Sequence, residues 1–251
     1  MNLTPILLFA IALIRPSVLV VGTPLFGGTF MPPMVRVGLI VILGAFMAPL
    51  IGLPRAIESG LFVTLVLREV LIGAALAMSV RLLVAGAELG GHLCGFQMGL
   101  SYAALVDPQS GVRNNVLAAL YVSLALLILL LTNGHHDLLR ALAASYEALP
   151  IGSGAVAADL AELVARMFGL MFTLGVRLAA PIVITLLLVE VALGAMARVA
   201  PTLNLMVTAA PVRLLVGWIA LALTVRVLPE ILARAFPQAL TLGARTAAAL
   251  H

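Results

Sequence analysis

The chain has 251 residues, of which 63% are hydrophobic and 10% are charged, and its mean hydropathy is +1.23. These values lie far outside the range of soluble globular domains and indicate a membrane or membrane-assembly protein. The formal net charge is +4, but all 14 basic residues are arginines, scattered along the chain without a basic patch or aromatic platform. This pattern argues against nucleic acid as a partner.

No Pro/Gly/Ser-rich or charged linker divides the sequence, so we expect a single all-helical domain over residues 1–251. Met1 to Pro24 lacks a basic n-region and a small-residue cleavage site, and is interpreted as the first helix rather than a signal peptide. Cys94 is the only cysteine, which excludes an internal disulfide and a cysteine-based metal site. We expect it to be a small packing residue.

Long apolar runs predict the helices in chain order, each near the roughly 20 residues that a bilayer span needs. The charge-free runs are Pro16–Val35, Val37–Pro54, Leu89–Val106 and Asn114–Gly134. Three further apolar runs contain ionisable residues: Leu61–Val84 with Arg68, Glu69 and Arg81, Phe168–Val191 with Arg177 and Glu190, and Leu203–Leu228 with Arg213 and Arg226. The predicted fold class is therefore all-α and membrane-associated, with about six hydrophobic helical segments built into long helical hairpins.

Ionisable residues in such runs are costly against lipid and are expected to face protein or water. We expect Glu69 to pair with Arg68 or Arg81, and Glu190 to pair with Arg177 or Arg198; a proton relay through the two carboxylates is the alternative. The arginines recur along the whole chain, so they do not orient it across a membrane. Either neighbouring subunits pair them, or they snorkel from helix ends.

Prolines and glycines predict where the helices end. We expect breaks at Pro32-Pro33, at Pro54, at Asp107-Pro108, between Leu149 and Gly154, and at Pro201. Glu58–Gly99 can then form one very long helix, with Val112–Tyr146 as its antiparallel partner. Pro181, Pro211 and Pro229 lie inside helical patterns and are expected to kink them.

Gly91, Gly95 and Gly99 recur every four residues and would form one side-chain-free stripe on a helix. Such a stripe lets another apolar helix pack closely, so we predict a helix-packing interface here. The stripe is followed by Asp107-Pro108, where the proline pushes its predecessor out of the α region and ends the helix in a loop.

Residues that could perform catalysis are few. Asn133-Gly-His135-His136-Asp137 could bind a metal, but adjacent helical histidines point about 100° apart and no further ligand has suitable spacing, so a helix boundary is favoured. Gly99-Leu-Ser101 resembles part of a nucleophile elbow, but it lacks the closing glycine and a preceding strand. We therefore predict no enzyme activity, no metal and no cofactor.

Several motifs in one order resemble a known family. Gly95-Phe-Gln97-Met98-Gly99-Leu-Ser101 is followed by Asp107-Pro108, Asn133-Gly134-His135, Ser145, Leu149-Pro150-Ile-Gly152, Ala180-Pro181, Gly194, Arg198-Val-Ala-Pro201-Thr-Leu-Asn204 and Pro211, with Arg15, Pro24, Pro32 and Arg36 near the start. This set resembles the FliR family of flagellar export-gate proteins over almost the whole chain. Gln97, Met98, Arg198, Pro201, Asn204 and Pro211 are the motif residues that the resemblance links to assembly.

The resemblance implies a structural subunit of the flagellar type III protein export gate, in the inner membrane and the flagellar basal body of a bacterium. The implied partners are a related export-gate ring subunit, a small two-helix export-gate subunit, an export-switch membrane protein, and the unfolded flagellar proteins that pass through the channel. It also implies that apolar helices pack within the assembly as well as against lipid.

The segment Leu100–Arg113 corresponds to the plug that closes the channel in that family. A narrow ring of apolar side chains excludes water and ions by dewetting, and glycine-rich flanks permit movement. The predicted plug residues are Leu100, Ser101, Tyr102, Leu105, Val106, Asp107, Pro108 and Gly111.

Two other functions are kept as alternatives. A multi-pass small-molecule transporter of the inverted-repeat type should show two matching halves, and the sequence contains no internal repeat. An intramembrane enzyme should bring polar groups together, and the chain has few of them.

Overall fold

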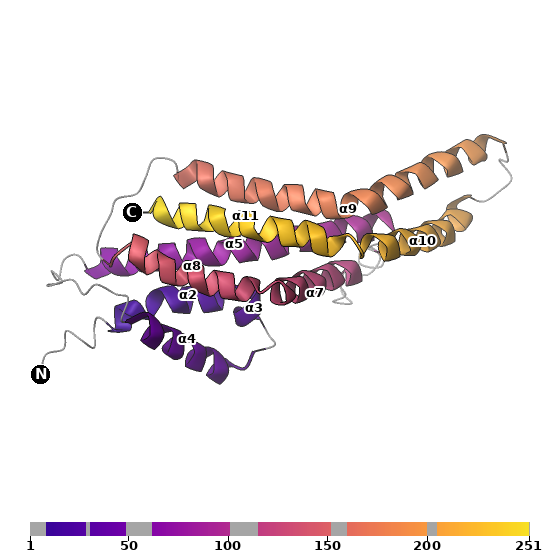
Figure 1. Cartoon of the computed structure of the whole chain (residues 1–251). Coiled ribbons are helices and arrows are strands. Elements are labelled where there is room, and N and C mark those ends of the chain that lie inside the picture. The colour runs from indigo at the N-terminus through magenta and orange to yellow at the C-terminus, as the bar shows by residue number, and fades with distance from the viewer. Residues whose placement is uncertain are drawn as a thin grey trace, which may run out of the picture. The chain divides into compact units, whose positions relative to one another are not determined.

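The computed structural model describes residues 9–28, 31–48, 62–100, 115–151, 160–199 and 205–250 (Figure 1). These residues form helices and contain no strands, which confirms the predicted all-α class. The helices are α2 (Ile14–Gly22), α3 (Pro24–Gly27), α4 (Pro33–Met47), α5 (Phe62–Gln97), α7 (Val116–Leu131), α8 (Gly134–Ala148), α9 (Leu160–Val199), α10 (Leu205–Thr224) and α11 (Leu228–Ala248).

Two helices are much longer than the rest: α5 has 36 residues and α9 has 40. By length and apolar composition both can cross a membrane, and α7 with α8 and α10 with α11 meet the same criteria as bent pairs, giving two to four spans among the described residues. The prediction of one very long helix ending near Gly99 is confirmed by α5, whose sequence is mostly apolar and contains no proline.

Three of the expected helices have different limits. Val112–Tyr146 is not one helix, because Asn133 adopts the left-handed region with φ of 57° and α8 begins anew at Gly134. The run Pro16–Val35 is divided at Thr23, whose backbone is extended, and again before α4. The helix expected to reach Val106 ends at Gln97, and Asp107-Pro108 lies outside the described residues.

The prolines fall into two groups. Pro181 and Pro211 lie inside α9 and α10, and Pro237 lies inside α11. Pro229 occupies the first turn of α11, where the missing N–H would have no helical acceptor, and the bend of 58° between α10 and α11 lies directly before it, so the helical pattern is bent close to Pro229, as expected. Pro33 begins α4 for the same reason, as expected from the Pro32-Pro33 break.

The chain divides into two compact units, and neither is contiguous in sequence. Unit 1 comprises Met1–Leu83, Leu129–Gly169 and Phe236–His251, and unit 2 comprises Val84–Ile128 and Leu170–Ala235. Buried apolar side chains fill each of them. The largest fully buried apolar side chains are Ile11, Leu19, Leu76, Leu138 and Leu142 in unit 1, and Met98, Leu117, Tyr121, Leu178, Ile182 and Leu186 in unit 2.

Candidate functional site

The predicted plug begins directly after α5. Leu100 is its one residue that the structure describes; Ser101, Tyr102, Leu105, Val106, Asp107, Pro108 and Gly111 lie outside the described residues, as do Pro201 and Asn204. The described residues that flank the segment are Leu100 and Asn115.

The first end is a glycine cap. Gly99 has a φ of 81°, in the left-handed region, and donates its N–H to the carbonyl of Phe96 at 3.0 Å, while Leu100 donates to the carbonyl of Gly95 at 2.9 Å. These two bonds form a Schellman motif, which satisfies the last carbonyls of the helix and requires a residue without a Cβ at Gly99. Gly99 consequently lies beyond α5 and does not extend the predicted stripe of Gly91 and Gly95.

Gly91 and Gly95 lie against α7, within unit 2. A Cβ atom on Gly91 would stand 2.5 Å from the Cα of Ala118 and 2.6 Å from the carbonyl oxygen of Leu117, so the two backbones touch at this point. A Cβ on Gly95 would collide with the side-chain amide of Asn115. Both glycines thus permit a close approach inside the chain, and an additional contact with another subunit stays a prediction.

Asn115 fixes the second end of the segment. Its Oδ1 accepts the N–H of Leu117 at 3.0 Å, an N-cap of α7, and its Nδ2 donates to the carbonyls of Gly91 at 3.5 Å and His92 at 3.4 Å. One amide therefore starts α7 and holds that start against the end of α5. Since Leu100 and Asn115 both contact Gly95, the two ends of segment 101–114 are held at one place.

Two buried side chains complete this site. Cys94 is fully buried, with its Sγ 3.6 Å from the hydroxyl of Tyr121 on α7, in agreement with a packing role. Met98 is also buried, and a Cβ on Gly217 of α10 would meet its side chain at 2.7 to 3.0 Å. The glycine of α10 leaves room for the methionine that precedes the cap, and sequence reasoning did not identify this pairing.

Substitution of Asn115 tests whether its amide stabilises the protein mainly as the N-cap of α7 or mainly through its hydrogen bonds to α5. Asn115→Ala removes both roles and should lower stability by about 1 kcal/mol or more. Asn115→Ser keeps an N-cap oxygen but is too short to reach α5, so its effect should be smaller if capping dominates. Thermal unfolding of the purified protein separates the two cases, and equal stability of Asn115→Ala and the wild type would exclude both.

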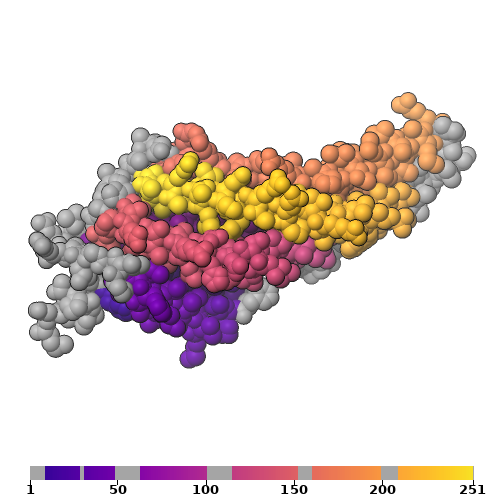
Figure 2. All heavy atoms as spheres, viewed as in Figure 1, coloured from indigo at the N-terminus to yellow at the C-terminus, as the bar shows by residue number. Residues whose placement is uncertain are grey.

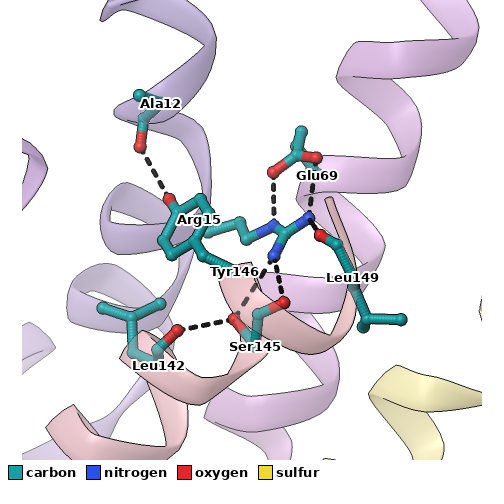
Figure 3. Close-up of polar contacts among 7 residues, drawn as sticks. All are labelled: Ala12, Arg15, Glu69, Leu142, Ser145, Tyr146 and Leu149. Atoms are coloured by element: carbon teal, nitrogen blue, oxygen red, sulfur yellow. Dashed lines mark hydrogen bonds and ion pairs between the residues drawn. The ribbon is translucent and has the colours of Figure 1, made fainter. Parts of the chain in front are cut away.

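A second polar cluster lies in unit 1 around Arg15, which is fully buried (Figure 3). Its Nε pairs with one carboxylate oxygen of Glu69 and its Nη2 donates to the other at 3.0 Å. Nη1 donates to the carbonyl of Ser145 at 2.8 Å and Nη2 to that of Leu149 at 2.7 Å. The guanidinium thus neutralises a buried carboxylate of α5 and caps the last carbonyls of α8.

The same cluster is closed by Tyr146. The Arg15 guanidinium carbon lies 4.5 Å from the centre of the Tyr146 ring, and the Tyr146 hydroxyl donates to the carbonyl of Ala12 at 2.8 Å. Gly73 of α5 faces the backbone of Arg15, where a Cβ would stand 3.0 Å from its carbonyl oxygen. Residues from α2, α5 and α8 therefore meet at one buried charge, which fixes how these three segments pack.

The predicted partners of both carboxylates were wrong. Glu69 pairs with Arg15, since neighbouring residues on a helix such as Arg68 and Glu69 do not face each other. Glu190 lies 3.3 Å from Arg213 of α10, in place of Arg177 or Arg198. The sequence does show opposite charges within apolar stretches, but which of them form pairs depends on which helices become neighbours.

The His135-His136 segment forms the start of α8, which confirms the helix-boundary interpretation. The two rings lie 4.1 Å apart, and Asp137 in the first turn pairs with Arg140 at 2.8 Å. Over the described parts of the chain, no group of three or more His, Cys, Asp or Glu side chains is arranged to hold a metal ion.

Comparison with known proteins identifies the family. The family model described as bacterial export proteins, family 1, matches residues 6–239. The flagellar biosynthetic protein FliR of Bacillus subtilis (strain 168) is 30% identical, covering 88% of this chain and 86% of that protein. FliR of Pectobacterium carotovorum subsp. carotovorum is 34% identical, covering 86% and 83%, and FliR of Escherichia coli (strain K12) is 32% identical, covering 82% and 79%. The chain belongs to the FliR family.

FliR membership makes the chain a membrane-embedded component of the flagellar protein export apparatus, which associates with other components of that apparatus. Its apolar helices agree with this setting. Of the FliR motif residues, Gln97 ends α5, Arg198 lies exposed near the end of α9, and Pro211 lies inside α10. All three belong to unit 2, where Gln97 and Arg198 lie at the C-terminal ends of their helices and Pro211 lies in the interior of α10.

Proposed function

We propose that this chain is a structural subunit of the flagellar type III export gate, and that it helps to form and to close the channel for unfolded flagellar proteins. In this proposal residues 1–251 act as one export-gate domain in the bacterial inner membrane, within the flagellar basal body. The proposed partners are a related ring subunit, a small two-helix subunit and an export-switch membrane protein. No catalytic step is assigned to any residue.

The observation that supports closure by the segment 101–114 is the fixing of both its ends on one helix. The glycine cap at Gly99 and Leu100 ends α5, and the side chain of Asn115 lies against Gly95 of the same helix. Loops that carry function are commonly positioned by the rigid elements at their ends. Its sequence is rich in apolar side chains, including Tyr102, Leu105 and Val106.

Such side chains can seal a narrow channel, because an apolar constriction is unfavourable for water and ions until it is widened or made polar. The proposal therefore assigns the ion barrier to Leu100, Tyr102, Leu105 and Val106. Asp107, Pro108 and Gly111 would end the apolar part, and Ser101 would begin it.

Deletion of Ser101–Gly111, with the ends rejoined by a few glycines, should leave the assembled complex intact but permeable to small ions. Cells that express it should grow more slowly, and membrane conductance of cells or vesicles containing the whole complex measures the leak. Tyr102→Asp or Leu105→Asp should produce a milder leak, since one charge wets a narrow apolar constriction.

Gln109→Asp is the matched control, because it adds the same charge at a position that is already polar. It should leave the conductance at the wild-type level. If the deletion assembles normally and does not raise the conductance, the segment is an ordinary connection and the proposed closure is wrong.

A further inference from the structure

One face of α9 combines exposed apolar side chains with an arginine. Phe172, Val176, Ile184 and Leu188 are all exposed. At 100° per residue they lie within about 160° of the helix circumference, and Arg177 lies within the same arc. In Figure 2 the atoms of α9, coloured salmon to orange, are uncovered along one edge of the view.

Arg177 is exposed, and no described residue forms an ion pair or hydrogen bond with its guanidinium. The carboxylates that could neutralise it within the described residues are mostly engaged elsewhere. The ion pairs are Arg15–Glu69, His92–Glu88, Arg140–Asp137, Arg166–Glu162, Arg213–Glu190 and Arg234–Glu230. The face therefore presents a cation in apolar surroundings, where an unpaired charge is unfavourable.

Pro181 leaves the backbone carbonyl of Arg177 without its helical hydrogen bond. It has no N–H, so the carbonyl of Arg177, four residues earlier, lacks the hydrogen bond that a helix normally gives it. The hydroxyl of Thr185 donates to the carbonyl of Pro181 itself at 2.7 Å and does not replace that bond. Arg177 thus offers a guanidinium that needs an acceptor and a carbonyl that can accept another donor.

Two glycines on this face have no packing role within the described chain. A Cβ on Gly169 or Gly194 would meet no atom within 4 Å, whereas a Cβ on Gly175, on the inner side, would stand 2.9 Å from the carbonyl oxygen of Gly86. Glycine inside a helix lowers its stability by roughly 0.5–1 kcal/mol relative to alanine. Open glycines on an apolar face allow close approach of a further helix, which lipid chains do not require.

We propose that this face of α9, defined by Phe172, Val176, Arg177, Ile184 and Leu188, docks an apolar helix of another export-apparatus subunit, whose carboxylate pairs with Arg177. The inference rests on the proposed function in that it places the partner in the export gate. The charge requires an acidic partner, the apolar side chains require an apolar helix, and the glycines favour a helix over lipid. An anionic lipid headgroup is the competing occupant that the experiment must distinguish.

The chain contains no lysine, which makes a selective test possible. Arg177→Lys introduces the only side-chain amine of this chain, and a water-soluble carbodiimide then joins that amine to a carboxylate in contact with it. The carboxylate loses one oxygen to the carbodiimide, which becomes a urea, and an amide bond forms to the amine nitrogen. In membranes containing the whole complex, we expect a product of this chain with one other protein, and mass spectrometry to locate the amide on an Asp or Glu within an apolar segment.

Arg140→Lys is the matched control, because Arg140 is exposed and pairs with Asp137 of its own helix. The introduced amine should couple within the chain and give no product with another protein. A photo-crosslinking amino acid at Ile184, which is 57% exposed, should label the same partner, whereas one at the fully buried Ile182 should not. Arg177→Leu should lower the yield of assembled complex about tenfold or more, as when one member of a desolvated ion pair is removed.

Lipid adducts alone at Ile184, with no coupling of Arg177→Lys to a protein, would overturn the proposal in favour of a headgroup. Protein adducts at Ile184 without carbodiimide coupling would overturn the carboxylate assignment. Neither result depends on ion conductance. The docking proposal can therefore be correct when deletion of Ser101–Gly111 causes no leak, and it can be wrong when that deletion raises the conductance.

Discussion

Arg15→Met is expected to remove most of the folded chain from the membrane. The substitution leaves the Glu69 carboxylate buried without its cation and the carbonyl of Leu149 without its guanidinium donor, while the carbonyl of Ser145 keeps only the N–H of Leu149. Breaking a buried ion pair costs about 3–5 kcal/mol, a large part of the 5–15 kcal/mol by which a typical protein is stable. The steady-state amount of chain in the membrane and thermal unfolding in detergent measure the loss.

Glu69→Gln should be less harmful, because the guanidinium keeps two carbonyl acceptors and the oxygen of the new amide. The double variant Arg15→Met with Glu69→Leu removes both charges and should recover part of the stability. Recovery should be incomplete, since the carbonyl of Leu149 remains without the guanidinium donor.

Arg140→Met provides the control for the loss of an arginine from an ion pair. The Arg140–Asp137 pair is exposed, so its removal should change stability by at most about 1 kcal/mol. If Arg15→Met is no more harmful than Arg140→Met, the buried cluster does not fix the packing of α2, α5 and α8.

This cluster also shows where sequence reasoning ends. Glu69 and Arg15 are 54 residues apart, and, except for Arg68 beside Glu69, each is isolated among apolar residues in the sequence. That isolation indicates that a partner is required, because a lone charge is costly in such surroundings. The choice among Arg15, Arg68 and Arg81 depends on how α2 packs against α5, which no local pattern specifies.

The long helix α5 was predictable because its sequence is apolar over most of its length and contains no proline. The pair α7 and α8 was harder to predict. Asn133-Gly134 was correctly interpreted as a helix boundary, yet the same residues were also placed inside one long partner helix. Asn tolerates the left-handed conformation and glycine begins the next helix, so local chemistry favoured the break. The preference of Asn133-Gly134 for a helix boundary therefore outweighs the expectation that a long helix has an equally long antiparallel partner.

The glycines illustrate a different limit. Spacing placed Gly91, Gly95 and Gly99 on one stripe, but the structure gives them three surroundings: a backbone contact, a side-chain contact and a left-handed cap. A glycine can be required for space or for conformation, and the sequence does not distinguish the two. Only Gly99 has a positive φ, so it alone is constrained by conformation among the three.

Gly91→Ala is therefore expected to separate α5 from α7, although alanine is the better helix former. Alanine gains about 1 kcal/mol over glycine in a helix interior. The added Cβ would stand 2.5 Å from the Cα of Ala118 and 2.6 Å from the carbonyl oxygen of Leu117. These are backbone atoms, so the clash cannot be relieved by a change of rotamer, and overpacking of this kind costs about 1–3 kcal/mol and occasionally more.

Gly38→Ala in α4 is the matched control, since a Cβ there would meet nothing within 4 Å. It should leave the unfolding temperature unchanged or raise it slightly, whereas Gly91→Ala should lower it, by about 2–4 °C for each kcal/mol lost. The opposite signs matter more than the sizes, because helix propensity alone predicts stabilisation at both positions. A Gly91→Ala protein as stable as Gly38→Ala would mean that α5 and α7 do not touch through their backbones at Ala118, and the anchoring of segment 101–114 at Asn115 would lose its structural basis.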